Sequence, residues 1–161
     1  VVVEFSDPFC PACRAAHETT REIKAAYENR VRWVFKDFPL ESHAGAKTAA
    51  EAAHCAGEQG KFWQYQDRVF QAEEKPDLDT LKQYAQSLGL DRKQFEQCLE
   101  SGKYRDRIET DIREGRNAGI SATPTFIING RMVSGALSFD EFKKKIDDVL
   151  DADRFRTSNP G

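Results

Sequence analysis

Two cysteines separated by two residues stand at the junction between a predicted strand and a predicted helix. The apolar run Val1 to Phe5 is typical of a strand, and Cys10-Pro11-Ala12-Cys13 opens the helical pattern that follows. Proline is tolerated in a first helical turn, so Pro11 predicts that the helix begins there and that Cys10 is its N-cap. Cys13 then lies close enough to Cys10 for a disulfide. The expected chemistry is thiol–disulfide exchange.

A helix start is a position that activates a cysteine. We expect the Cys10 sulfur to accept a hydrogen bond from the amide of Ala12 or Cys13, and the positive end of the helix dipole favours the thiolate. Two alternatives remain open: a static disulfide, or half of a zinc site with His17, one helical turn after Cys13, as third ligand. The chain has no second CxxC motif, so we predict redox chemistry and no bound metal.

Length and charge narrow the class of protein. The chain has 161 residues, 39% of them hydrophobic, which suits one domain with a proper core. A net charge of -3 provides no basic surface for a nucleic acid, and the apolar runs are too short to cross a bilayer. The chain opens on Val1 inside a predicted strand, with no initiator Met and no signal peptide. We therefore expect a mature or excised piece.

The other two cysteines, Cys55 and Cys98, fall in separate helical patterns. An even number of cysteines favours a second disulfide, which would persist only in an oxidising compartment. In the chain-entropy model, closing a loop of this length stabilises the fold by about 4 kcal/mol. The alternative is a pair of unrelated buried thiols.

The first half of the chain reads as strand, helix and strand followed by helices. Strand Val1 to Phe5, helix Pro11 to Tyr27 and strand Val31 to Phe38 predict a right-handed βαβ unit with parallel strands. The first strand is apolar on both faces, which suits a central position. Residues 44–118 follow with helical spacing throughout, and Asp77 and Asp91 have the position of N-caps. We expect an insertion of several short helices.

The second half returns to the sheet. Strand Thr125 to Ile128, the hairpin turn Asn129-Gly130 and strand Arg131 to Ser134 predict a β-hairpin. Ser138 and Glu141 have capping-box spacing at the start of a last helix. We predict a single domain over residues 1–150 and a polar, disordered tail over 151–161.

The order of these motifs resembles the thioredoxin-fold oxidoreductases of the DsbA-like kind. The resemblance covers about residues 1–150 and rests on CxxC after one strand, Thr123-Pro124 before another, and helices between them. Four strings add to it: Glu4-Phe5-Ser6-Asp7, Phe35-Lys36-Asp37-Phe38-Pro39-Leu40, Gly60-Lys61-Phe62-Trp63, and Thr123-Pro124-Thr125-Phe126-Ile127-Ile128-Asn129-Gly130. The fold that it implies is α/β: a thioredoxin-like fold with a central mixed sheet, flanking helices and an inserted helical subdomain.

The sequence departs from this group at two points. The outer strand that thioredoxins carry before the first strand is missing, which suggests N-terminal trimming or a shortened sheet. The dipeptide Pro11-Ala12 lacks the histidine of the strongest oxidants.

The resemblance assigns roles to the cysteines and the loop opposite them. Cys10 would be the attacking, more exposed thiolate, and Cys13 the buried thiol that resolves the mixed disulfide. Thr123-Pro124 would be a cis peptide that turns the backbone of Thr123 toward a substrate strand, although an ordinary trans turn is the alternative. Pro11 and Ala12 would lie beside the bound substrate.

Three further residues complete the predicted site. By resemblance, Glu4 is the buried acid that exchanges a proton with the resolving cysteine, and burial should raise its pKa; the alternative is a charge at the rim of the sheet. Lys36, on the neighbouring strand, is its expected partner. Phe9 is expected to stay exposed and to line a peptide groove, whereas Trp33 and Trp63 are expected in the core.

These observations predict a thiol:disulfide oxidoreductase without cofactor that acts on reduced or misoxidised proteins outside the cytoplasm, in the periplasm or cell envelope. We expect an oxidase that is reset by a membrane or soluble redox partner, with a potential of about -270 to -120 mV. A reductase or isomerase is the alternative within this class. Two alternatives lie outside this class: a non-catalytic peptide-binding or zinc-holding module, and the soluble domain of a larger membrane protein.

Overall fold

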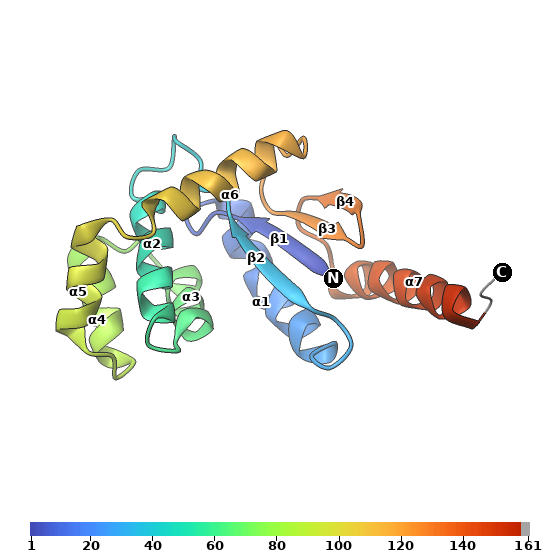
Figure 1. The fold of residues 1–161 in the computed structure, drawn as a ribbon, viewed down its shortest axis with the longest axis horizontal. Coiled ribbons are helices and arrows are strands. Elements are labelled where there is room, and N and C mark those ends of the chain that lie inside the picture. The colour runs from blue at the N-terminus through green and yellow to red at the C-terminus, as the bar shows by residue number, and fades with distance from the viewer. Residues whose placement is uncertain (159–161) are drawn as a thin grey trace.

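A four-stranded mixed sheet carries helices on both faces and a helical subdomain at one end (Figure 1). The computed structural model describes residues 1–158, with side chains described up to residue 155. The elements in chain order are β1 (Val2–Ser6), α1 (Pro11–Ala26), β2 (Trp33–Asp37), α2 (Ala46–Gly57), α3 (Phe62–Gln71), α4 (Leu78–Ser87), α5 (Arg92–Ser101), α6 (Arg105–Asn117), β3 (Thr125–Ile128), β4 (Arg131–Ser134) and α7 (Phe139–Ser158). The predicted fold class is confirmed. No helix within these residues combines the length and the apolarity needed to cross a bilayer.

The strands lie in the order β2-β1-β3-β4. β1 pairs with β2 in parallel and with β3 antiparallel, and β3 and β4 form an antiparallel hairpin around Asn129-Gly130. β1 is thus an interior strand, as its continuous apolar sequence predicts. The two edges of the sheet are β2 and β4.

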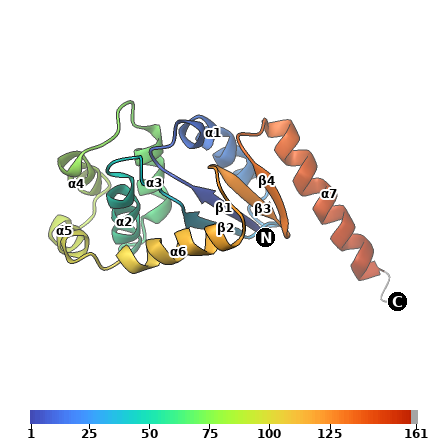
Figure 2. The ribbon, with the colours of Figure 1, turned by 90° about the horizontal axis from the view of Figure 1, so that it is seen from above.

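Helices cover the two faces of the sheet with separate cores. In Figure 2, α1 and α6 lie on opposite sides of the strands. The α1 and α7 face is filled by Val2, Ile23, Tyr27, Phe126, Ile128, Phe142 and Ile146. The α6 face is filled by Phe5, Phe38, Ala50, Ile108, Ile112 and Ile120. Helix α6 therefore packs on the sheet as well as on α2, although its sequence lies within the predicted insertion.

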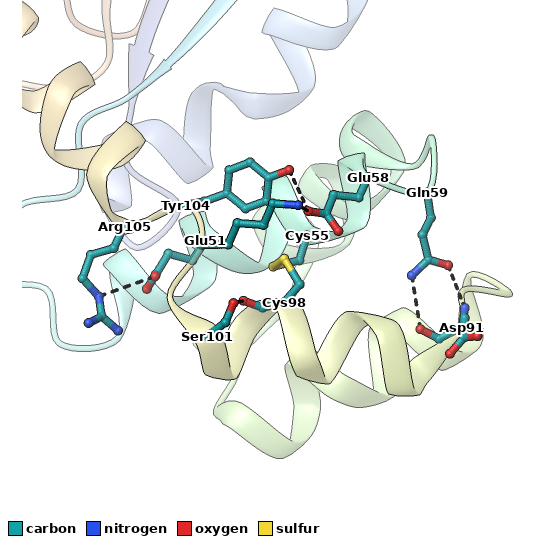
Figure 3. Close-up of a disulfide and its surroundings, with 10 residues drawn as sticks. Glu51, Cys55, Glu58, Gln59, Asp91, Cys98, Ser101, Tyr104 and Arg105 are labelled. Carbon is teal, nitrogen blue, oxygen red and sulfur yellow. Dashed lines mark hydrogen bonds and ion pairs between the residues drawn. A yellow bond between two sulfur atoms is a disulfide. The ribbon is translucent and has the colours of Figure 1, made fainter.

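Helices α2 to α5 form the helical subdomain around a core that includes Tyr65 and Phe95. The carboxylates of Asp77 and Asp91 accept hydrogen bonds from the amides of Thr80 (2.9 Å) and Gln94 (3.0 Å), as expected of N-caps. The predicted disulfide between Cys55 and Cys98 is present and joins α2 to α5, with 5.8 Å between the Cα atoms (Figure 3).

The last helix is longer than the sequence pattern predicts. Ser138 caps the helix, with the Glu141 amide donating to its hydroxyl at 3.2 Å, and that hydroxyl donates in turn to the Glu141 carboxylate at 3.0 Å. The helix then continues through Ser158, so the predicted disorder from 151 is wrong as far as residue 158; residues 159–161 lie outside the described part of the chain. No proline or glycine interrupts residues 151–158, and Asp153 accepts a hydrogen bond from Asn129 at 2.9 Å. A polar composition suits a solvated helix as well as a tail.

Candidate active site

A buried carboxylate fixes the loop that leads from β1 to the first cysteine. Asp7 is fully buried and accepts hydrogen bonds from the amides of Phe9 (2.8 Å) and Leu40 (2.9 Å). Its second oxygen also lies 2.6 Å from Nδ1 of His43. Sequence reasoning did not identify Asp7, although an Asp-Pro dipeptide after a strand is a turn signal. The loop reaches Cys10 in a fixed conformation because its backbone amides are bonded.

The two cysteines lie at the start of α1 as free thiols. Cys10 occupies the N-cap and is 8% exposed, whereas Cys13 is 2% exposed, so the expected order of accessibility holds although both are buried. The predicted cap bond is absent, because the Cys10 sulfur makes no hydrogen bond to the first turn. It turns instead toward the carbonyl oxygen of Thr123, at 3.6 Å.

The environment of Cys13 disfavours its thiolate. Burial raises the pKa of Cys13 to about 12, while the hydroxyls of Ser6 and Thr123 and the amide of Asp7 offset part of the rise. The Asp7 amide lies 3.5 Å from the Cys13 sulfur. Cys13 packs with Cys10 and Phe70 in a small apolar cluster, against which Phe35 also packs. Cys13 is therefore a protonated thiol at neutral pH.

The loop before β3 faces the cysteine pair. The Thr123-Pro124 peptide is cis, as predicted. The carbonyl of Pro124 accepts a hydrogen bond from the amide of Gly135, the residue after β4, at 2.8 Å, which fixes this loop. The side chains of Thr123 and Pro124 are buried, whereas Pro11 and Ala12 are exposed. The exposed residues beside Cys10 are thus those of the first turn of α1, while Thr123 contacts the Cys10 sulfur from a buried position.

Glu4 is buried on the α1 face of the sheet, at 7% exposure. Burial raises its pKa, while a hydrogen bond from Trp33 Nε1 (3.0 Å) and the charges of Lys24 and His17 oppose the rise. A cavity of about 20 Å³, room for one water molecule, is lined by Glu4, Lys24 and His17 among others. The structure thus places Glu4 in the interior and not at the rim.

Lys36 is not the partner of Glu4, and that prediction was wrong. In the β1–β2 register, Glu4 lies opposite Phe35, so Lys36 projects from the other face of the sheet. Its Nζ lies 3.1 Å from Glu114 and 3.7 Å from Asp111, both on α6. The cation near Glu4 is Lys24 of α1, whose pKa is lowered by burial and raised in part by the Glu4 charge.

Phe9 does not line a groove, and that prediction was also wrong. Its side chain is 2% exposed and belongs to the core of the helical subdomain. The ring packs so closely on Gly45 that a Cβ there would lie 3.1 Å from it. The Asp7 bond to the Phe9 amide turns the chain inward at this point. Phe9 therefore joins the active-site loop to the subdomain.

Trp63 does not lie where the sequence predicts, and His17 contacts two residues of α3. Trp63 is 40% exposed and not in the core, with Lys24 Nζ 3.2 Å from the centroid of its ring. His17 Nε2 lies 3.0 Å from Asp67, and its ring stacks on Phe70 at 4.8 Å between centroids. Over residues 1–158, no group of three or more His, Cys, Asp or Glu side chains has the arrangement of a metal site.

The sequence matches the family model described as Thioredoxin over residues 1–148. The chain belongs to the thioredoxin family. Among solved structures, a thioredoxin-like oxidoreductase from Silicibacter pomeroyi superposes with a TM-score of 0.84 and 27% identity, over 93% of this chain and 86% of that one. The α-DsbA1 protein of Wolbachia pipientis superposes with a TM-score of 0.79 and 25% identity, over 91% and 83%. The predicted membership of the DsbA-like group is confirmed.

Curated relatives show the same segment within longer proteins. The Na(+)/H(+) antiporter NhaA 3 of Salinispora tropica is 33% identical over 156 residues, which are 96% of this chain and 24% of that protein. The chain thus spans about a quarter of the length of the curated relatives that it matches. With the oxidoreductase fold and the CxxC pair in place, the predicted enzyme class, a protein thiol:disulfide oxidoreductase, is confirmed at this level.

Proposed function

We propose that this chain is a disulfide-forming oxidase that acts on reduced proteins outside the cytoplasm. The observation that carries the proposal is the asymmetry of the cysteine pair at the start of α1. Cys13 is 2% exposed with its pKa raised to about 12, and Cys10 lies at the surface side of the pair beside exposed Pro11 and Ala12. A client can therefore reach only Cys10, and Cys13 can act only as the thiol that resolves the mixed disulfide.

The exchange follows from this asymmetry. A client thiolate attacks the Cys10 sulfur of the oxidised pair, and the electron pair of the broken bond leaves on Cys13, which takes up a proton because its pKa is high. A second client thiolate then attacks the client sulfur of the mixed disulfide, and Cys10 leaves as the thiolate. The client has lost two electrons, and the enzyme holds two reduced cysteines. A membrane or soluble redox partner then accepts these electrons.

Glu4 is the proposed proton carrier for Cys13. Its raised pKa keeps the carboxyl protonated closer to neutrality than an ordinary glutamate, as proton transfer to a thiolate requires. The small cavity beside Glu4 is lined by Phe35 and Phe70; Phe70 belongs to the apolar cluster that contains Cys13, and Phe35 packs against that cluster. One water molecule in this cavity would be near both groups. Lys24, and not Lys36, then adjusts the acidity of Glu4.

The client contacts are proposed to be mainly with backbone. The Pro124 carbonyl is already bonded to the Gly135 amide, so the main-chain groups of Thr123 are those proposed to meet a client beside the Cys10 sulfur. Pro11 and Ala12 add an exposed apolar surface. Main-chain hydrogen bonds place little demand on client sequence, which suits an enzyme with many clients.

The second disulfide supports both the compartment and the direction of reaction. A Cys55–Cys98 bridge persists where thiols are oxidised, outside the cytoplasm. In such a compartment an oxidase needs only to be re-oxidised, whereas a reductase needs a supply of electrons. That the domain belongs to a larger membrane protein, as the antiporter names of its relatives would fit, stays a prediction; the proposal concerns the redox segment alone.

A glutathione redox series tests the proposal. Free thiols at Cys10 and Cys13 are counted by mass after alkylation, and an oxidase should show a reversible two-electron transition above about -200 mV and below about -120 mV. A transition near about -270 mV would favour a reductase instead. A pair that never titrates would indicate a static or metal-holding module.

Two matched variants test the roles of the cysteines. In Cys13→Ser the Cys10 thiolate should attack a disulfide-bonded client, release one client thiolate and stay trapped in the mixed disulfide, whereas Cys10→Ser should trap none, and both variants keep the Cys55–Cys98 bridge. Oxidation of a reduced client and reactivation of a scrambled client, measured side by side, separate an oxidase from an isomerase. Equal trapping by both variants would refute the assignment of the attacking cysteine.

A further inference from the structure

The backbone of Asp7 contacts both cysteines of the redox pair. Its carbonyl oxygen accepts a hydrogen bond from the Cys10 amide at 3.1 Å, and its amide donates to the Cys13 sulfur at 3.5 Å. Asp7 is the first residue after β1, which ends at Ser6. The orientation of this one residue therefore affects both halves of the pair.

The amide of Asp7 faces the sulfur on which negative charge develops during exchange. When a thiolate attacks the Cys10 sulfur, the S–S bond breaks and its electron pair passes to Cys13. Burial raises the pKa of Cys13 to about 12, and the hydroxyls of Ser6 and Thr123 and the amide of Asp7 oppose that rise. A donor that is fixed before the step lowers the barrier, because it does not have to reorient as the charge appears.

His43 holds the side chain of Asp7 from the loop between β2 and α2. Its Nδ1 lies 2.6 Å from the Asp7 oxygen that also accepts from the Leu40 amide. An ionised carboxylate can only accept, so Nδ1 carries the proton of this bond. The backbone of His43 is fixed in turn, since its amide donates to the Leu40 carbonyl at 3.0 Å and its carbonyl accepts from the Ala46 amide at 3.1 Å. The imidazole thus has a defined position against Asp7.

We propose that His43 is a positioning residue for disulfide exchange, which holds the Asp7 carboxylate so that the Asp7 amide stays directed at the Cys13 sulfur. His43 acts through Asp7 and not on a sulfur itself. The same amide serves the reverse reaction, in which the Cys13 thiolate attacks the mixed disulfide and the client leaves as a thiolate. The proposal therefore rests on exchange at the cysteine pair and not on the direction proposed above.

Three variants of the whole chain test the hydrogen bond from His43. His43→Leu removes the donor, His43→Asn keeps a nitrogen donor as many bonds from the backbone as Nδ1, and His43→Gln places that donor one bond farther away. The His43 side chain is 19% exposed and lines a pocket of about 160 Å³, so water can reach the polar replacements.

The assay follows the reduction of the oxidised chain by excess reduced glutathione at one fixed pH, with the loss of the Cys10–Cys13 disulfide counted by mass after alkylation. His43→Leu and His43→Gln should react about tenfold more slowly than the unaltered chain, and His43→Asn within about twofold of it. The loss is smaller than for removal of a whole donor, because the Asp7 amide itself remains.

His54→Leu is the matched control for stability. Nε2 of His54 lies 2.6 Å from buried Asp37, in a second His–Asp pair that joins α2 to the end of β2. His54→Leu should lower the melting temperature, as His43→Leu does, but it should react at the rate of the unaltered chain.

Three results would each overturn the proposal: an unchanged rate in His43→Leu, equal slowing by His54→Leu, or equal rates for His43→Asn and His43→Gln. If His43→Leu does not fold, the comparison of the asparagine and glutamine variants decides alone. The direction of the enzyme is read from the equilibrium glutathione series and not from these rates, so failure here and failure of the oxidase proposal are distinguishable.

Discussion

The Cys55–Cys98 disulfide is predicted to act mainly by restricting the unfolded chain. It joins α2 to α5 across a sequence separation of 43 residues, and both cysteines are buried, at 1% and 7% exposure (Figure 3). A closed loop of that length lowers the entropy of the unfolded state by an amount worth about 4 kcal/mol at room temperature. A domain of this size has a free energy of unfolding of about 5 to 15 kcal/mol, so the bridge supplies a large share.

Two double variants separate the crosslink from packing. Replacing both residues by alanine removes the crosslink and two buried sulfurs, and it should lower the free energy of unfolding by about 5 kcal/mol. Replacing both by valine restores volume without a crosslink, and about 4 kcal/mol should still be lost. Because the unfolded chain becomes more extended, the denaturant m-value should rise in both.

Urea unfolding followed by circular dichroism measures this loss. The measurements belong in a Cys10→Ser/Cys13→Ser background, so that only one cysteine pair can react. If the valine variant regains most of the stability, or if the m-values do not change, the effect lies in packing and not in the unfolded chain. A loss below about 1 kcal/mol would refute the crosslink argument altogether.

Three further predictions concern the buried charges and the sheet. Because the folded chain raises the pKa of Glu4 above 4.5, the contribution of Glu4 to the free energy of unfolding should be fully present below that pH and be lost as the pH rises through the folded pKa. Glu4→Gln should flatten this fall when urea unfolding is measured from about pH 4 to about pH 8, and an unchanged curve would contradict the burial argument. Lys24→Met should extend this fall to higher pH because it removes the nearby positive charge, and the same substitution in a Glu4→Gln chain is the control, in which an equal extension would argue against Lys24 as the partner. Gly115→Ala should destabilise by about 1 to 3 kcal/mol, since a Cβ there would lie 2.7 Å from the Phe38 ring, and a rise in melting temperature would show that the ring moves at no cost.

The sequence predicts the elements well because each carries a local signal. Periodicity marks the helices, and the side chains of Asp77 and Asp91 cap α4 and α5 as their positions indicate. The same is true of the hairpin turn at Asn129-Gly130, where both residues adopt positive φ. These features depend on neighbours within a few residues. Local chemistry is sufficient to place them.

The partner of Glu4 shows where local signals end. Lys36 lies on the strand next to Glu4, but a shift of one residue in strand register moves every side chain to the other face. The sequence predicts which strands pair more readily than it predicts which residues lie opposite each other. Lys24 has no signal of its own, since it is one of many charged residues on α1. It becomes the partner only when α1 packs on the Glu4 face.

Phe9 shows that the inserted helices belong to the redox site. This residue, next to Cys10, packs into the subdomain core, and Phe70 of α3 belongs to the same apolar cluster as both cysteines. Arg14 of α1 adds polar contacts, donating to the carbonyls of Pro8 (3.1 Å) and Val69 (2.9 Å). Burial is the largest cause of the raised Cys13 pKa, and part of that burial comes from the subdomain. A change in how α3 packs on α1 would therefore alter the acidity of Cys13 without any change in the CxxC motif.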